Sequence, residues 1–106
     1  MDYVRIGTVK DLGSTKIKSY KIFGRIIAVL KKADGSYEAI EAACKHQGAD
    51  LTTGERKGWT VTCPRHGWKY DLETGHCLNH DSLPLKKYNL KIDGEDIHVS
   101  LQPIEE

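Results

Sequence analysis

Two short loops, CKHQG at residues 44–48 and CPRHG at residues 63–67, decide how this chain is interpreted. Each loop places one cysteine and one histidine within four residues, and sixteen residues separate His46 from Cys63. Thiolate sulfur and imidazole nitrogen are donors that iron, zinc and copper prefer. The spacing C-x-H-x16-C-x2-H therefore predicts a metal centre whose ligands are Cys44, His46, Cys63 and His66.

A glycine follows each pair, Gly48 in the first loop and Gly67 in the second. Glycine lets backbone N–H groups approach a ligand because it has no Cβ. Anionic sulfurs need such donors, so both glycines are candidates for support of the metal centre.

The motif resembles the cluster-binding motif of the Rieske family. CKHQGADL at 44–51 is similar to that family's first loop, and CPRHGWKYDLETG at 63–75 is similar to its second loop and the following hairpin. In Rieske proteins two cysteines bind one iron and two histidines bind the other iron of a [2Fe–2S] cluster. The resemblance implies the same cofactor and the same division of ligands here.

A single zinc ion is the alternative that two cysteines and two histidines leave open. Zinc fingers pair cysteine with cysteine and histidine with histidine. Here each half of the motif is mixed, which favours a two-metal cluster. The two interpretations differ in colour, because an iron–sulfur protein is red-brown and a zinc protein is colourless.

Size and composition indicate an ordinary globular protein. The chain has 106 residues, 29% of them charged, and a formal net charge of +1. We expect one domain over 1–106, with no general affinity for nucleic acid or membranes. No signal peptide is recognisable, and the apolar run 26–30 is far shorter than the roughly 20 residues a membrane helix needs. A soluble cytoplasmic protein is predicted.

Cys77 remains after the two proposed cysteine ligands are assigned. An odd thiol without a secretory signal favours a reducing cytosol. We interpret Cys77 as a small buried strand residue. His76, His80 and His98 lack ligand spacing, and surface or hydrogen-bonded roles are expected for them.

The remaining pattern is that of an all-β protein, with many short apolar or alternating segments and no helical periodicity. Residues 10–14 are expected to form a turn, 48–58 a polar insert, and 102–106 a frayed end. A small helical turn near Leu12 or over 45–51 is left open. The resemblance implies a Rieske-type antiparallel β-sandwich with a small hairpin lobe over about 43–81 that holds the cluster. The predicted strands are 3–6, 16–23, 25–30, 36–42, 59–62, 68–72, 76–78, 88–92 and 97–101.

The resemblance also concerns residues around the cluster. Tyr70 matches a tyrosine whose hydroxyl reaches a cysteine sulfur, here that of Cys44, although a half-buried strand aromatic is an equal alternative. Trp68 stands where high-potential relatives have a serine that donates to a sulfide. Ala49 and Arg65 stand where those relatives have a disulfide between the loops. A cluster of low potential is therefore expected, near roughly −150 mV.

Residues 79–82 differ from the proline-containing cover of many relatives, which leaves the shielding of the cluster's inner side open. Lys45 and Arg65 lie between the ligands of each pair. They are candidates for docking an acidic redox partner, and scattered surface charge is the alternative.

The predicted function is that of a Rieske-type ferredoxin similar to those of ring-hydroxylating oxygenase systems. Such a protein carries one electron from a flavin reductase to a terminal oxygenase or other oxidoreductase and catalyses no reaction by itself. A Rieske-like small subunit of a nitrite reductase and a cluster-based redox sensor are the alternatives.

Overall fold

The computed structural model describes residues 3–44, 48–65 and 67–104. Strands dominate these ranges, with two short 3-10 segments, and no helix in them is long and apolar enough to cross a membrane. The elements in chain order are β1 (Tyr3–Thr8), η1 (Val9–Thr15), β2 (Ile17–Ile22), β3 (Arg25–Lys31), β4 (Tyr37–Glu41), η2 (Leu51–Thr53), β5 (Arg56–Lys57), β6 (Thr60–Thr62), β7 (Lys69–Asp71), β8 (Lys87–Asp93) and β9 (Asp96–Pro103).

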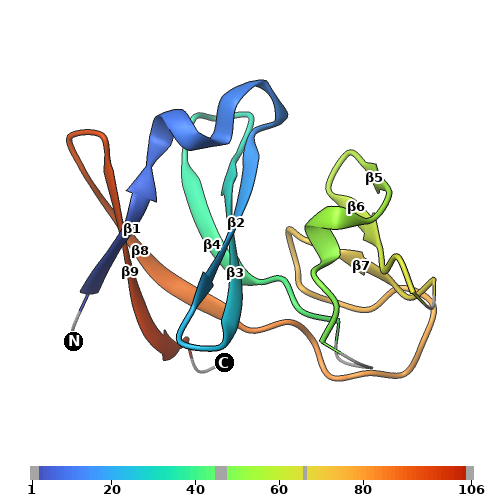
Figure 1. The fold of residues 1–106 in the computed structure, drawn as a ribbon. Helices are drawn as coiled ribbons and strands as arrows, with labels where there is room; N and C mark the ends of the chain where they lie inside the picture. Colours follow the sequence, from blue (N-terminus) through green and yellow to red (C-terminus); the bar gives the residue numbers. More distant parts are fainter. Residues whose placement is uncertain (1–2, 45–47, 66, 105–106) are drawn as a thin grey trace.

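The strands form a six-stranded sheet, in the order β1-β9-β8-β4-β3-β2, and a three-stranded sheet, in the order β5-β6-β7. Every pairing is antiparallel. Figure 1 separates the two bodies: the larger sheet, here called the base, and the smaller sheet with the loops around it, here called the lobe. The all-β fold with a small hairpin lobe is therefore confirmed.

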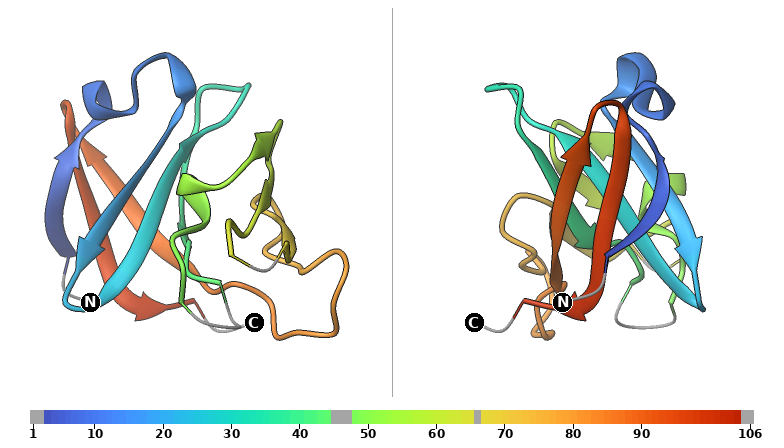
Figure 2. Two further views of the ribbon diagram at one scale, coloured as in Figure 1. Left: turned by 45° about the vertical axis from the view of Figure 1, so that its right-hand side comes forward. Right: turned by 90° about the vertical axis from the view of Figure 1, so that its left-hand side faces the viewer.

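The base is a sheet folded over on itself. Figure 2 shows that the β1-β9-β8 half crosses the β4-β3-β2 half. Side chains of both halves meet between them, including Ile27 and Ala39 from one and Tyr88 and Val99 from the other. Burial of these apolar side chains supplies the main stabilisation of the base.

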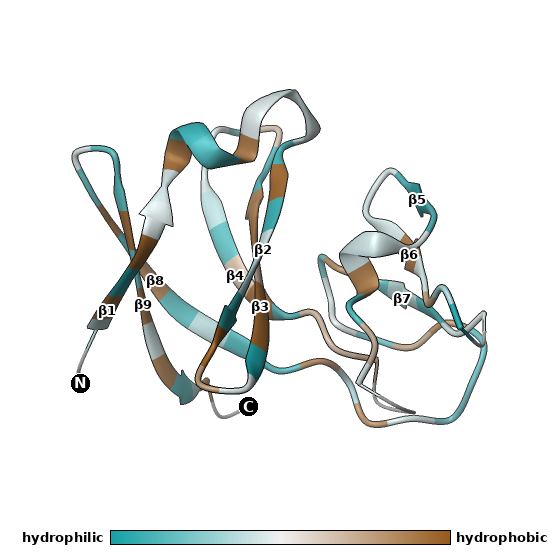
Figure 3. Cartoon of the chain, in the orientation of Figure 1, coloured by the Kyte–Doolittle hydropathy of each residue, from teal (hydrophilic) through white to brown (hydrophobic). Residues whose placement is uncertain are grey.

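The apolar run of β3 is buried on both faces, and this explains why it does not alternate. Ile27 and Val29 point into the base, where they join its two core clusters. Ala28 and Leu30 point the other way and pack with residues of the lobe. Figure 3 shows this apolar stretch along β3. The lobe is therefore seated on the outer face of β3 and β4.

Polar contacts fix the lobe on the base. The Ser19 hydroxyl of β2 donates to Asp50 Oδ2 at 3.0 Å and accepts from the Thr52 hydroxyl at 3.1 Å. The Arg56 guanidinium donates to the Thr15 carbonyl at 2.6 Å. The Lys87 ammonium donates to the Glu73 carbonyl at 2.7 Å and pairs with Glu38 of β4.

Three expectations for individual segments need correction. Residues 10–14 are part of the 3-10 segment η1, so the helical turn left open near Leu12 replaces the expected simple turn, and Asp11 accepts there from the Thr8 backbone N–H at 3.0 Å. Residues 76–78 form no regular strand, and Cys77 makes a single bridge to Tyr70. Residues 102–104 are ordered, because Pro103 pairs with Tyr88 and the Ile104 N–H donates to the Lys87 carbonyl.

Candidate metal centre

The two cysteine loops close on the same hydrogen-bond pattern. In the first loop the Cys44 N–H donates to the Ala49 carbonyl at 2.9 Å, and the Gly48 N–H donates to the Cys44 carbonyl at 2.7 Å. In the second the Cys63 N–H donates to the Trp68 carbonyl at 2.7 Å, and the Gly67 N–H donates to the Cys63 carbonyl at 3.1 Å. The chain therefore presents its two cysteines in equivalent six-residue loops.

Gly48 and Gly67 allow this closure through their backbone conformation. Their φ angles are +73° and +74°, in the left-handed region that disfavours side chains. Each glycine's own N–H is bonded to the carbonyl of the preceding cysteine. The contribution visible in the described residues is thus to shape the loops.

Different elements deliver the two thiols to one apolar cluster. β4 leads into Cys44, and β6 leads into Cys63. Both cysteines are only 2% exposed and pack in the cluster with Leu51, Val61 and Leu72, and neither is in a disulfide. Two buried thiols in matching loops suit a shared metal group from which water is excluded.

The Tyr70 hydroxyl contacts the sulfur of the first cysteine, Cys44. Tyr70 is fully buried on β7, and its hydroxyl is 3.9 Å from Cys44 Sγ, at the outer limit for a hydrogen bond to sulfur. The contact with Cys44 is the one implied by the resemblance. A phenol O–H is the stronger donor of the two groups, so it would donate once the sulfur is a thiolate.

The second loop is held by residue 79, which the sequence did not single out. The Asn79 amide accepts from the Lys69 N–H at 2.9 Å and donates to the Gly67 carbonyl at 3.0 Å. One side chain thereby bonds the backbone on both sides of Trp68, as a neighbouring strand would. The adjacent His80 ring stacks on Trp68 with a centroid separation of 4.4 Å and an interplanar angle of 18°.

These contacts answer the question about residues 79–82 in part. The segment has no proline, yet its first two residues contact the second loop through Gly67, Trp68 and Lys69. Cys77 is only partly buried against the same apolar cluster and forms an isolated bridge to Tyr70, so the expectation of a fully buried strand residue is corrected.

The described part of the chain contains the sulfur half of the predicted site. No group of three or more candidate metal-binding side chains occurs within it. The two proposed histidine ligands, His46 and His66, lie outside the described residues. Lys45 lies outside them too. Arg65 is exposed, and Ala49 is partly buried against the apolar cluster.

Comparison with known proteins gives the family. The family model described as the Rieske [2Fe-2S] domain matches residues 2–89. The chain belongs to the Rieske family. Its cofactor is accordingly a Rieske-type [2Fe–2S] cluster, and the paired loops with their buried thiols fit the cysteine half of such a cluster.

Relatives of this Rieske protein differ in length. It is 36% identical over 72 residues to a Rhodococcus rhodochrous protein named 3-ketosteroid-9-alpha-monooxygenase, oxygenase component. The aligned residues are 68% of this chain and 19% of that relative. It is 25% identical over 105 residues to the ferredoxin component of the alkene monooxygenase system of Xanthobacter autotrophicus, covering 98% of the chain and 85% of that protein. The chain thus spans about a fifth of the length of the first relative and most of the second.

Solved structures share the fold. The ferredoxin of carbazole 1,9a-dioxygenase from Nocardioides aromaticivorans IC177 superposes with a TM-score of 0.77 at 27% identity, over 96% of this chain and all of that one. A structure titled as a complex of reduced oxygenase and oxidized ferredoxin in carbazole 1,9a-dioxygenase gives a TM-score of 0.80 at 23% identity, over 98% of this chain and 97% of that one.

Proposed function

We propose that this Rieske protein is a one-electron carrier that passes electrons from a reductase to a terminal oxidoreductase such as an oxygenase. The observation that supports this most is the pair of equivalent loops, each burying one cysteine at the end of a strand. The near full-length likeness to ferredoxin components points to the same role. On this proposal the chain catalyses no reaction by itself.

The ligands in this proposal are Cys44 and Cys63 for one iron and His46 and His66 for the other. The cluster, when bound, takes up and releases one electron. The chain's own contribution is to keep both sulfurs out of water and to fix the loops through the carbonyl of each cysteine. Tyr70 lies within reach of the Cys44 sulfur, and Asn79 holds the second loop.

The proposal also covers the domain organisation, the partners and the cellular compartment of the protein. Residues 1–106 act as one Rieske domain, with the cluster in a lobe over about 43–81. Partners are a flavin reductase and an oxygenase or another oxidoreductase in the cytoplasm. Lys45 and Arg65 contribute docking charge beside the ligands.

Ligand substitution with metal analysis tests the site. Cys44→Ser, His46→Ala, Cys63→Ser and His66→Ala should each lose the visible absorption bands. The wild type should contain about two irons per chain, as a [2Fe–2S] cluster requires, with acid-labile sulfide. Cys77→Ala is the matched control and should retain the cluster. One zinc per chain without sulfide would contradict the proposal.

The carrier role needs a second experiment. A carrier should be isolated without a catalytic chain, accept electrons from a flavin reductase and reduce an oxygenase component in solution. Purification in a fixed complex with a larger catalytic chain would indicate a subunit instead. A change in a partner's affinity with cluster oxidation state would indicate a sensor.

A further inference from the structure

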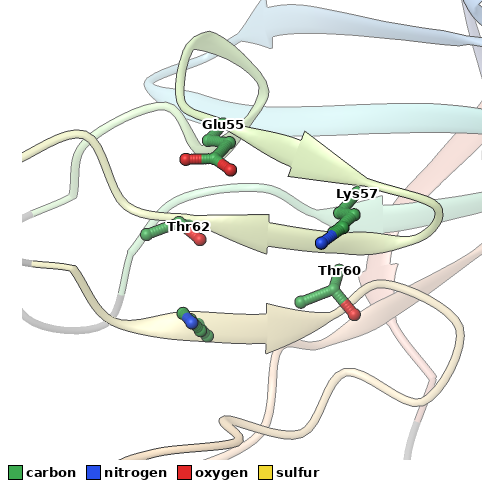
Figure 4. A pocket seen from close by; sticks show the side chains of 5 residues that line it. Glu55, Lys57, Thr60 and Thr62 are labelled. Carbon is green, nitrogen blue, oxygen red and sulfur yellow. The ribbon is translucent and has the colours of Figure 1, made fainter.

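The outer face of the three-stranded sheet carries a groove that the metal centre does not use. It has a volume of about 250 Å³ and is lined by Glu55, Lys57, Thr60, Thr62 and Lys69. Figure 4 shows Glu55, which directly precedes β5, together with Lys57 of β5 and Thr60 and Thr62 of β6 along it. The alternation of these strands creates this face, because Val61 and Tyr70 point inward and are fully buried.

Strand register brings the groove's polar groups together. Thr62 is paired with Lys69 and Thr60 with Lys57, so a lysine lies beside each threonine on either side of β6. The Thr62 N–H also donates to the Glu55 carbonyl at 2.8 Å. Two ammonium groups, two hydroxyls and the Glu55 carboxylate therefore line one groove. Asp71 of β7 is paired with Thr60 and lies on the same face.

The charges of this groove are not used within the described part of the chain. Glu55, Lys57 and Lys69 take part in no side-chain hydrogen bond or ion pair there. Two neighbouring charged side chains do bond within the chain. The Arg56 guanidinium donates to two carbonyls, and Asp71 Oδ1 accepts from the Glu73 N–H. Among the described residues, the Lys57 and Lys69 ammonium groups thus have no hydrogen-bond or ion-pair partner.

The groove is next to the second cysteine loop. Thr62 directly precedes Cys63, and β7, which begins at Lys69, follows the loop. A protein seated over the groove would therefore also border the loop that carries a proposed iron ligand.

We propose that this groove binds an acidic side chain on the surface of an electron-transfer partner. Lys57 and Lys69 would pair with its carboxylate, and the hydroxyls of Thr60 and Thr62 would donate to the same oxygens. Glu55 opposes an acidic partner and limits the affinity, which suits a carrier that must dissociate after each transfer. The inference rests on the proposed carrier function and adds the partner's chemistry and the surface it contacts.

The test measures electron exchange with two probe proteins of opposite charge by stopped-flow absorbance. The acidic probe is a reduced plant-type [2Fe–2S] ferredoxin, a donor near −400 mV. The basic probe is oxidised cytochrome c, which accepts electrons from the reduced Rieske protein. The variant is Lys57→Gln with Lys69→Gln. The matched control is Lys21→Gln with Lys91→Gln, which removes the same charge from exposed positions on β2 and β8 of the base.

At low salt the groove variant should react with the acidic probe about fivefold more slowly than the control variant, since steering depends on nearby charge. The difference should vanish near 0.5 M salt, where charges are screened within a few Å. Glu55→Gln should accelerate the same reaction, and the groove variant should not slow transfer to cytochrome c. The midpoint potential should stay unchanged in all variants.

Equal rates for the groove and control variants would overturn the inference while leaving the carrier function intact. A monomer–dimer equilibrium in ultracentrifugation that the groove variant abolishes would assign the groove to a second copy, and would also overturn it. A wild type that exchanges electrons with neither probe would refute the carrier function, and the inference with it.

Discussion

At the residue scale, the contact between Tyr70 and Cys44 connects the buried core to the metal centre. A buried tyrosine hydroxyl usually has a hydrogen-bond partner. The Cys44 sulfur lies 3.9 Å from the Tyr70 hydroxyl. Reduction adds negative charge to the cluster, so a donor aimed at a ligand sulfur stabilises the reduced form more than the oxidised form.

Tyr70→Phe should therefore lower the reduction potential. If the bond is stronger in the reduced state by about 1 kcal/mol, the loss corresponds to roughly 40 mV for one electron. The ring keeps its place in the core, so the iron content should not change. Voltammetry of both proteins measures the shift, and an unchanged potential would mean that the hydroxyl does not donate to the sulfur.

At the element scale, the Asn79 side chain extends the pairing of β7 beyond the Tyr70–Cys77 bridge. Its amide bonds the backbone before and after Trp68, and the Leu78 N–H donates to the Lys69 carbonyl at 2.7 Å. The second cysteine loop is thus fixed by the chain that follows the hairpin.

Asn79→Ala should loosen this loop, because two hydrogen bonds worth about 1 kcal/mol each are lost. We expect faster loss of the visible bands when the oxidised protein is warmed with a chelator. His80→Ala is the matched control, since it removes the stacking on Trp68 and retains both amide bonds. Equal rates of cluster loss in wild type and Asn79→Ala would show that the loop is fixed by other contacts.

The element scale also explains what the sequence could predict. Strands such as Tyr37–Glu41 and the final hairpin follow from alternation and Asp-Gly turns, which are local signals. The Cys44–Tyr70 contact could be predicted because the resemblance to the Rieske family implies it. The role of Asn79 could not, because its partners lie ten and twelve residues away and no periodicity relates them. The ordered end at 102–104 was missed because β9 continues its pairing with β8 past a register shift, as far as Tyr88 and Pro103.

At the scale of the whole molecule, an ion cluster joins the base to the lobe. Glu38 of β4 pairs with Lys32 and with Lys87, and Lys87 also donates to the Glu73 carbonyl in the lobe. Burial raises the pKa of Glu38, but the two ammonium groups outweigh it and hold that pKa below the ordinary value. The ionised carboxylate therefore stabilises the fold above the ordinary carboxyl pKa, and this contribution is lost as pH falls through the lowered folded-state pKa.

Glu38→Gln should lower the melting temperature at pH 7. Removing one partner of a partly buried pair costs about 1–3 kcal/mol, and each kcal/mol is worth roughly 4–8 °C in a domain of this size. The difference in melting temperature between wild type and Glu38→Gln should become smaller below about pH 4, where the Glu38 contribution is lost. Glu95→Gln, which breaks the exposed pair with Lys10, is the control and should change little. Equal effects of the two substitutions in calorimetry would contradict the role of Glu38.

The reduction potential is a property of the whole site, and we expect it near the low end of the Rieske range, roughly −150 mV at neutral pH. Each hydrogen-bond donor to a cluster sulfur raises the reduction potential. In the described part of this chain, some of the side-chain donors expected in high-potential relatives are replaced, and some backbone donors are bonded to other groups. On the resemblance to the Rieske family, Trp68 stands at the position of the serine of high-potential relatives, and Ala49 and Arg65 stand at the positions of their disulfide cysteines. The N–H groups of both cysteines, Gly48 and Gly67 are bonded to carbonyl oxygens within the loops. Among the described residues, the side-chain donor within reach of the Cys44 sulfur is Tyr70, and one such bond corresponds to only tens of millivolts. Protein-film voltammetry decides the matter: a midpoint above about +100 mV, in the upper half of the family range, would mean that donors outside this account control the cluster.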